Sequence, residues 1–225
     1  MEAGGPFSPE WKPLTFDNIA THTQYELVSD GSTVVVQATS TRSASGLTRE
    51  ISIDPKTYPI VEWRWKISNV YEKGDVSTQS GDDYPARLYI TFEYDGEKVG
   101  FFEKIQFEAL RLIYGQYPPI GAINYIWAHT SPTGTHLPNS YTARTHMFVI
   151  QSGSDKVNQW VTEKHNVYED YKKAFGEEPP RISGVAIMTD TDNTQESAVA
   201  WYGDIMFIQG AAENQPTGMN KKPDQ

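Results

Sequence analysis

The residues Val61-Glu62-Trp63-Arg64-Trp65-Lys66-Ile67 alternate between apolar and charged side chains without a break. Successive side chains of a strand point to opposite faces of a sheet, so this stretch predicts a strand with one buried and one polar face. A second stretch, Arg87 to Tyr94, alternates in the same way and stops at Asp95-Gly96. Further strands are predicted over residues 25–28, 33–37, 49–53, 123–128, 145–151, 182–189 and 198–209, the first two joined by a hairpin turn at Asp30-Gly31.

Two short helices interrupt this pattern. Apolar residues with helical spacing predict one helix from Phe102 to Tyr114. The other is predicted from Val167 to Phe175, where Asn166 can cap the start and Gly176 can end it. Many strands with one or two short inserted helices predict an all-β fold, a two-layer antiparallel β-sandwich, with an open barrel as the alternative.

The sequence predicts one domain with loosely held ends. Residues 1–12 are rich in Gly and Pro and predict a flexible segment, residues 13–209 carry the sandwich, and residues 210–225 read as a polar tail. No interior linker or repeat divides the chain.

Composition excludes several classes of function. The net charge of −10 repels phosphate backbones and anionic membranes, so nucleic acid is not an expected partner. The absence of Cys excludes disulfides, thiol nucleophiles and zinc–thiolate sites. No run of 18 apolar residues predicts a membrane span, and the start of the chain lacks the features of a signal peptide.

The polar faces of the two alternating strands are the first candidate site. Arg64 and Lys66 lie opposite the tryptophans of their strand, and Arg87 and Tyr89 lie opposite Leu88. If the two strands pair, these four side chains converge into a basic face for a carbohydrate or another polar anionic ligand. The alternative is a solvated face with ordinary cross-strand ion pairs.

Two acidic loops are candidates for a metal. Asp82 and Asp83 precede the Arg87 strand, and Asp190 and Asp192 follow the strand over 182–189. Carboxylates of this kind bind Ca²⁺, the single cofactor that the sequence suggests. The alternatives are that Asp82 and Asp83 anchor Arg87 or cap a turn, and that the second loop forms Asx-turns.

A segment rich in aromatic residues is the third candidate. Trp127, Asn139, Tyr141 and Arg144 supply rings, an amide and a guanidinium, which are the groups that bind sugars. The alternative for Trp127 is a place in the core. No nucleophile elbow, metal-binding histidine motif or phosphate loop occurs, so no catalytic residues are predicted.

Three motifs carry a resemblance to a known family. They are Trp63-Arg64-Trp65-Lys66, the stretch from Asp82 to Phe92, and the stretch from Gly184 to Thr194 followed by Ala200-Trp201-Tyr202-Gly203-Asp204-Ile205. The chain resembles a family of uncharacterised exported bacterial proteins catalogued as a domain of unknown function. The resemblance implies a periplasmic or extracellular location and no particular activity. The last strand is also similar to that of galactose-binding-like jelly rolls, which is a likeness of fold alone.

These observations support three hypotheses of function. The first is an exported, non-catalytic binding module for a carbohydrate or an acidic glycan. The second is a polysaccharide-active enzyme, a lyase or a glycoside hydrolase, on the same scaffold; a lyase would use Tyr89 or His146 as the base and Lys66 and Arg87 as the cations. The third is a structural or assembly protein of the cell envelope.

Overall fold

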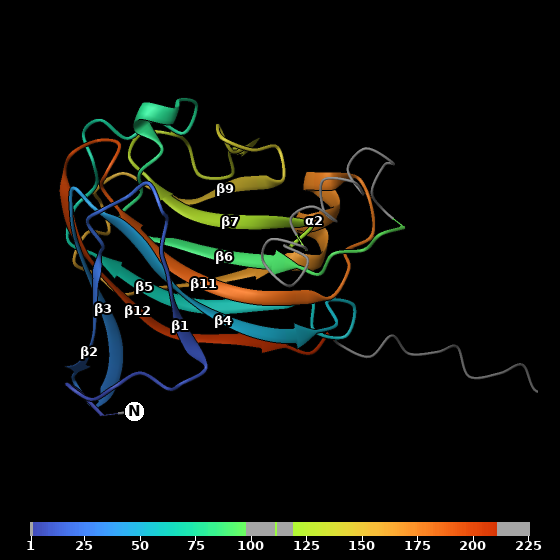
Figure 1. The fold of residues 1–225 in the computed structure, drawn as a ribbon, viewed down its shortest axis with the longest axis horizontal. Helices are drawn as coiled ribbons and strands as arrows, with labels where there is room; N and C mark the ends of the chain where they lie inside the picture. The colour runs from blue at the N-terminus through green and yellow to red at the C-terminus, as the bar shows by residue number, and fades with distance from the viewer. Residues whose placement is uncertain (1, 98–110, 112–118, 211–225) are drawn as a thin grey trace, which may run out of the picture.

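The computed structural model describes residues 2–97, 111 and 119–210, and these form two packed β-sheets (Figure 1). The larger sheet has seven strands, in the spatial order β1 (Trp11–Leu14), β4 (Ala44–Ile53), β11 (Ile182–Asp190), β6 (Arg87–Phe92), β7 (Gly121–Ala128), β9 (Thr145–Ser152) and β8 (His136–Pro138). The smaller sheet has five, in the order β10 (Val161–Asn166), β5 (Ile60–Ile67), β12 (Ser197–Ile208), β3 (Thr33–Thr41) and β2 (Gln24–Asp30).

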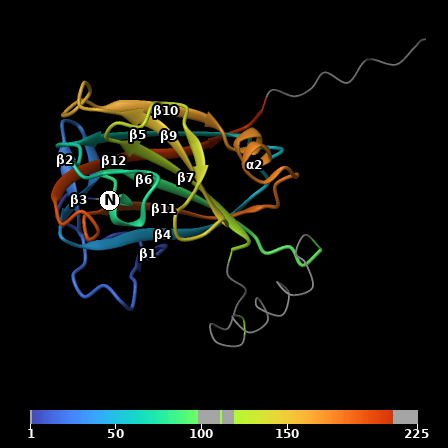
Figure 2. The ribbon, with the colours of Figure 1, turned by 90° about the horizontal axis from the view of Figure 1, so that it is seen from above.

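The two layers confirm the predicted β-sandwich. In Figure 2 the strands β10, β5 and β12 form one layer and β11, β4 and β1 form the other. Among the described strand pairs only β7 and β9 run parallel, and all the others are antiparallel.

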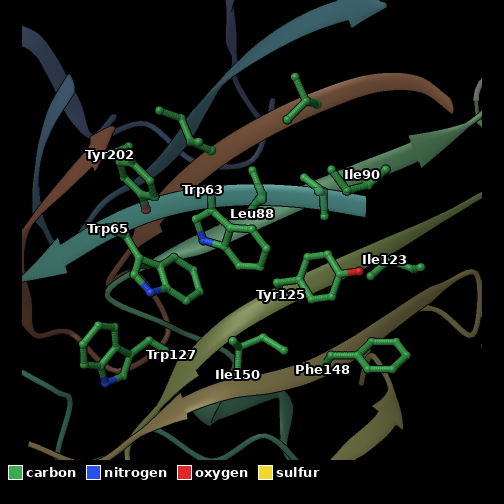
Figure 3. Close-up of a cluster of buried hydrophobic side chains, with 14 of the residues drawn as sticks. Trp63, Trp65, Leu88, Ile90, Ile123, Tyr125, Trp127, Phe148, Ile150 and Tyr202 are labelled. Atoms are coloured by element: carbon green, nitrogen blue, oxygen red, sulfur yellow. The ribbon is translucent and has the colours of Figure 1, made fainter. Parts of the chain in front are cut away.

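The core between the sheets is rich in aromatic rings (Figure 3). Trp63 stacks on Tyr125 with ring centroids 5.1 Å apart, and Trp65 meets the edge of Trp63 at 5.3 Å. The residues that alternate toward the inner faces of β5, β6 and β11 are all buried, as period-2 alternation predicts: Trp63, Trp65, Leu88, Ile90, Phe92, Val185 and Ile187. Alternation therefore identified the inner face of β5, β6 and β11 correctly.

The two alternating strands do not pair, so the basic face predicted from their pairing is wrong. β5 lies in the five-stranded sheet and β6 in the seven-stranded sheet, so the two face each other across the core. Since Trp63 and Leu88 both point into the core, Arg64 and Arg87 point away from it in opposite directions. The four residues Arg64, Lys66, Arg87 and Tyr89 therefore do not form one face.

The connection between β5 and β6 covers the outer side of the larger sheet. Val76 and Tyr84 from this connection pack on Ile126, Met147 and Val149 and form a second apolar cluster. As a result β7 is buried on both faces along its whole length, which explains its nearly continuous apolar sequence.

The helix from Val167 to Phe175 is confirmed as α2, at one end of the sandwich (Figure 1). The side chain of Asn166 accepts a hydrogen bond from the Glu169 amide, and Gly176 ends the helix with a φ of 74°. The Asp30-Gly31 hairpin is also present, because Asp30 pairs with Thr33 and Gly31 has a φ of 62°. The helix predicted over 102–114 lies outside the described residues, Arg111 excepted, and the tail predicted over 210–225 lies outside them beyond Gly210.

The short strands β1, β8 and β10 were not predicted. All three lie at the edge of a sheet, where polar residues interrupt the apolar pattern. β1 crosses the predicted boundary at residue 13, and Phe7 and Trp11 pack against the core, so the N-terminal segment belongs to the sandwich. Among the described residues, no helix has the length and apolar character needed to cross a membrane.

The two central tryptophans give a test of the core. Trp63 Nε1 has no hydrogen-bond partner among the described residues, whereas Trp65 Nε1 donates to Glu163 at 3.3 Å. Trp63→Phe and Trp65→Phe remove similar apolar volume, but only the second also removes a buried hydrogen bond. We expect Trp65→Phe to lower the free energy of unfolding by about 1 kcal/mol more than Trp63→Phe, measured by urea denaturation. Equal losses would show that the Glu163 bond adds nothing to stability.

Candidate functional site

A pocket of about 280 Å³ opens on the outer face of the seven-stranded sheet. Tyr89 and Met188 from neighbouring strands supply part of its lining, since they alternate with core residues on β6 and β11. The full lining consists of Phe16, Asn18, Ile19, Ala44, Asp82, Arg87, Tyr89, Asn139, Tyr141, Thr145, Met188, Asp190, Asp192 and Asn193. The predicted candidates Asp82, Arg87, Tyr89, Asn139, Tyr141, Asp190 and Asp192 therefore meet at one place.

Arg87 is buried in this wall of the pocket and fully engaged by protein groups. Its Nε donates to Asp190 Oδ1 at 2.9 Å, and its Nη2 donates to Asp190 Oδ2 and to the carbonyl oxygen of Asp82. Its Nη1 donates to the Tyr89 hydroxyl at 3.1 Å, and the guanidinium carbon lies 4.4 Å above the Tyr84 ring. Arg87 is thus neutralised inside the protein and is unsuited to holding an anionic ligand.

The pocket instead carries surplus negative charge. Asp82, Asp190 and Asp192 line it together with Arg87, so three carboxylates face one guanidinium. Burial raises the pKa of Asp192 above its ordinary range, and the adjacent Asp83 carboxylate raises it further. This electrostatic environment favours a neutral ligand or a cation over an acidic glycan.

Tyr141 lines the pocket and is 56% exposed, more than any other large hydrophobic residue among those described. Its hydroxyl accepts a hydrogen bond from Asn193 Nδ2 at 2.9 Å and donates one to the carbonyl oxygen of Gln79 at 3.2 Å. Asn139 binds the Tyr141 amide through Oδ1 and donates to Asp82 Oδ2 at 2.9 Å. An exposed ring is therefore held in a fixed orientation beside a polar cavity.

Buried hydroxyl groups fix the loop that carries Asp192 and Asn193. Thr191 Oγ1 lies 2.8 Å from Ser40 Oγ and accepts a hydrogen bond from the Ser43 amide at 3.1 Å. Thr23 joins the same network through Ser40 Oγ at 3.1 Å and the carbonyl oxygen of Thr189 at 2.7 Å. The acidic loop is thus tied to both sheets.

Asp83, Asp190 and Asp192 bring carboxylate oxygens within 4.8 Å of one another at the pocket wall. Asp83 Oδ2 accepts hydrogen bonds from the Thr194 amide and hydroxyl, while Asp83 Oδ1 has no partner in the part of the chain that the structure describes. The two acidic loops that the sequence suggested for a metal therefore do meet, with Asp82 beside them in the ion pair with Arg87.

Arg64 and Lys66 lie on the far side of the molecule, on the outer face of the five-stranded sheet. The Lys66 ammonium lies over both Trp160 and Trp201, at 5.0 and 4.6 Å from the ring centroids, and pairs with Asp30 at 3.4 Å. Arg64 stacks on the same Trp160 ring at 4.6 Å. These cations therefore belong to a separate, half-buried aromatic surface that sequence reasoning missed.

Two further predicted ligand-binding residues lie outside the pocket. Trp127 is completely buried, packs on Trp65 with ring centroids 6.0 Å apart and donates from Nε1 to the Gly153 carbonyl at 3.0 Å. It belongs to the core, because residue 127 shares the inner face of β7 with Tyr125. Arg144, just before β9, does not line the pocket, and its Nη1 donates to the Ile120 carbonyl at 3.5 Å.

Sequence reasoning also missed part of the pocket. Phe16, Asn18 and Ile19 lie in the connection after β1, which follows no alternating pattern. Asn193 lies within the acidic loop, and its amide is a hydrogen-bonding group of the kind that binds sugars. Its neighbour Asp192 was the signal that would have found it.

Fold and pocket together define a β-sandwich with one polar, aromatic-rimmed cavity on the outer face of its larger sheet. The chain belongs to the family described as "Protein of unknown function (DUF3047)", whose model matches residues 9–206. This membership confirms the resemblance drawn from the sequence motifs. Among curated proteins, none matches the chain significantly.

Several solved structures are similar in fold. The family 11 carbohydrate-binding module of the cellulosomal cellulase Lic26A-Cel5E of Clostridium thermocellum is 10% identical, with a TM-score of 0.42 over 96% of each chain. The family 12 xyloglucanase from Bacillus licheniformis is 9% identical, with a TM-score of 0.41 over 91% of this chain and 88% of that chain. The family 30 carbohydrate-binding module of Cel9D-Cel44B of Clostridium thermocellum is 11% identical, with a TM-score of 0.37 over 90% of this chain and 87% of that chain.

The internal pairing of Arg87 leads to a prediction about stability. Arg87→Ala leaves two buried carboxylates, Asp190 and Asp82, without their counter-charge. We expect a loss of about 3–5 kcal/mol in the free energy of unfolding, measured by urea denaturation. Arg49→Ala is the matched control, because Arg49 pairs with Glu10 in an exposed ion pair and should lose less than about 1 kcal/mol. A loss at Arg87 as small as that at Arg49 would contradict its role as an internal counter-ion.

Proposed function

We propose that this protein is a non-catalytic binding module that takes a neutral carbohydrate in the pocket on the outer face of the seven-stranded sheet. The observation that carries the proposal is Tyr141, an exposed ring held in place by hydrogen bonds from Asn193 and to Gln79 in the lining of a polar cavity. A ring fixed before binding loses little conformational freedom when a ligand arrives.

The chemistry of the lining supports a sugar as the ligand. The C–H face of a pyranose ring can stack on Tyr141, while its hydroxyl groups bind the amides of Asn139 and Asn193 and the carboxylate of Asp192. The pocket volume of about 280 Å³ is slightly below the usual range for ligand pockets, about 300–1,000 Å³. We infer that it holds one or two sugar units of a longer chain.

The charge of the lining supports a neutral glycan rather than the acidic one that the basic face had suggested. Three carboxylates, only partly offset by the internally paired guanidinium of Arg87, repel uronates and sulfates. The family resemblance supports the further proposal that the protein meets this glycan outside the cytoplasm, in the periplasm or beyond the cell.

The enzyme hypothesis divides into two cases. A lyase is disfavoured because its proposed groups lie apart: Lys66 is on the other sheet, and His146 is paired with His136 at the edge of the larger one. Burial also raises the pKa of Tyr89 to about 12, partly offset by Arg87, so Tyr89 is a poor base at neutral pH. One observation supports a glycoside hydrolase. The pKa of Asp192 is raised, and a second carboxylate, Asp190, lines the same pocket, as the paired carboxylates of such enzymes do.

A binding experiment tests the main proposal. A panel of neutral oligosaccharides is titrated into the protein by calorimetry, starting with a β-1,3-1,4-mixed-linked tetrasaccharide, the ligand of one similar carbohydrate-binding module. We expect Tyr141→Ala to weaken binding on the order of tenfold or more through loss of the stacking surface, with an unchanged melting temperature. Tyr141→Phe should weaken it less, because the ring remains and only its two hydrogen bonds are lost.

Trp201→Ala is the control for the second aromatic surface. Trp201 lies on the five-stranded sheet, so its removal should leave the affinity unchanged. Binding that is lost in Trp201→Ala and kept in Tyr141→Ala would overturn the assignment of the pocket. Release of reducing ends from the same oligosaccharides, if abolished by Asp192→Asn, would show that the protein is a hydrolase and not a non-catalytic binding module.

Salt dependence separates a neutral from an acidic ligand. Binding of a neutral glycan should change less than about twofold between 50 and 500 mM NaCl, because no charges are paired on association. Tighter binding to uronate oligosaccharides, weakened by salt, would contradict the proposed ligand class.

A further inference from the structure

The acidic cluster at the pocket wall lacks the positive charge that its burial requires. Asp83 and Asp190 are 1% and 2% exposed, and Asp82 is 5% exposed. Arg87 is the counter-ion of Asp190 and lies 3.6 Å from Asp82 Oδ1. Four carboxylates, counting the half-buried Asp192, therefore share a single guanidinium, and buried charges of one sign are costly unless paired.

Polar atoms without partners surround the same cluster. Asp82 Oδ1, Asp83 Oδ1 and the Tyr71 hydroxyl are all buried and make no hydrogen bond with the described residues. Burial raises the pKa of Tyr71 well above its ordinary value, and the charges of Asp190 and Asp83 raise it further. Buried polar groups are nearly always satisfied, so the unpartnered oxygens of Asp82 and Asp83 indicate a ligand there.

We propose that Asp83, Asp190 and Asp192 bind a calcium ion at the wall of the pocket. All the available donors are oxygens, which suit a hard cation. Their separations of up to 4.8 Å are about twice a Ca²⁺–oxygen distance of 2.3–2.6 Å, whereas Mg²⁺ requires a tighter octahedron. The ion offsets part of the negative charge of the four carboxylates, which still exceeds that of Ca²⁺ and Arg87 together, and it joins the loop before β6 to the loop after β11.

The proposed ion also reaches the pocket. Asp190 and Asp192 line the cavity, whereas Asp83 lies behind them. A calcium ion held by all three therefore stands between the protein interior and the cavity, and it stiffens the wall that carries Asn193. This site goes beyond the proposed function, because cation binding can be measured with no sugar present.

Terbium luminescence and thermal melting test the site directly. Protein stripped with EDTA is titrated with Tb³⁺, and bound Tb³⁺ is then displaced by CaCl₂. We expect saturable luminescence, displacement with a dissociation constant of about 10⁻⁵–10⁻³ M, and a melting temperature several degrees higher in excess CaCl₂. Unchanged melting together with no saturable luminescence would overturn the proposal.

Asp192→Asn distinguishes a cation site from a merely structural acidic cluster. In EDTA the variant should be as stable as the wild type or more so, because a like charge beside Asp83 has been removed. In CaCl₂ it should be less stable, because a ligand has been lost. A structural role would lower the melting temperature equally in both buffers, and that result would contradict the proposal.

Two further variants complete the test. Asp83→Asn keeps an oxygen that can accept the bonds from Thr194 and should also lose the response to calcium. Asp155→Asn, which removes an exposed carboxylate from the loop before β10, should keep the full response. Loss of the response in Asp155→Asn to the same degree would show that calcium acts through general charge screening.

Discussion

Arg87 and Asp190 are each almost completely buried, and neither could leave water without the other. Their ion pair sets the rest of the outer face of the larger sheet in place. It fixes the loop before β6, because Arg87 also holds the Asp82 carbonyl, and it fixes the end of β11, because Asp190 accepts a hydrogen bond from the Tyr84 amide at 3.1 Å. With these two segments in position, Asn139 can bind Asp82 and Tyr141 can bind Asn193. The pocket thus lies between loops that the Arg87–Asp190 ion pair holds in place.

Sequence periodicity predicted the strands and their inner faces but not which strands are neighbours. Alternation along β5 and β6 shows only which residues of each strand face the core. The pattern is the same whether the two strands are neighbours in one sheet or lie in different sheets, as they do here. Pairing depends instead on how the connection between them runs, and that connection crosses from one layer to the other and then packs on β7. The edge strands β1, β8 and β10 were not predicted. Most of their residues are exposed or half-buried, so apolar and polar residues do not alternate along them.

The candidate site was predicted in composition and only partly in arrangement. Acidic residues in irregular segments were predicted as candidates. Asp82 and Asp190 do lie close together, because both form ion pairs with Arg87. Trp127 was misplaced because an aromatic residue in a strand looks the same whether it faces a ligand or the core, and only its parity with Tyr125 decides. The aromatic surface around Lys66 was missed because Trp160 and Trp201 come from distant parts of the chain.

That separation along the chain has a consequence for how the protein is made. The groups that bind Arg87 and Asp83 across the pocket wall lie 103 and 111 residues further along the sequence. Contacts between such distant segments form late, since a long loop must close before they contribute any stability. In a nascent chain whose β11 has not yet emerged from the ribosome, Arg87, Asp82 and Asp83 therefore remain hydrated. The outer face of the larger sheet is incomplete until β11 is in place. The pocket can therefore form only after β11 and the loop that follows it have been synthesised.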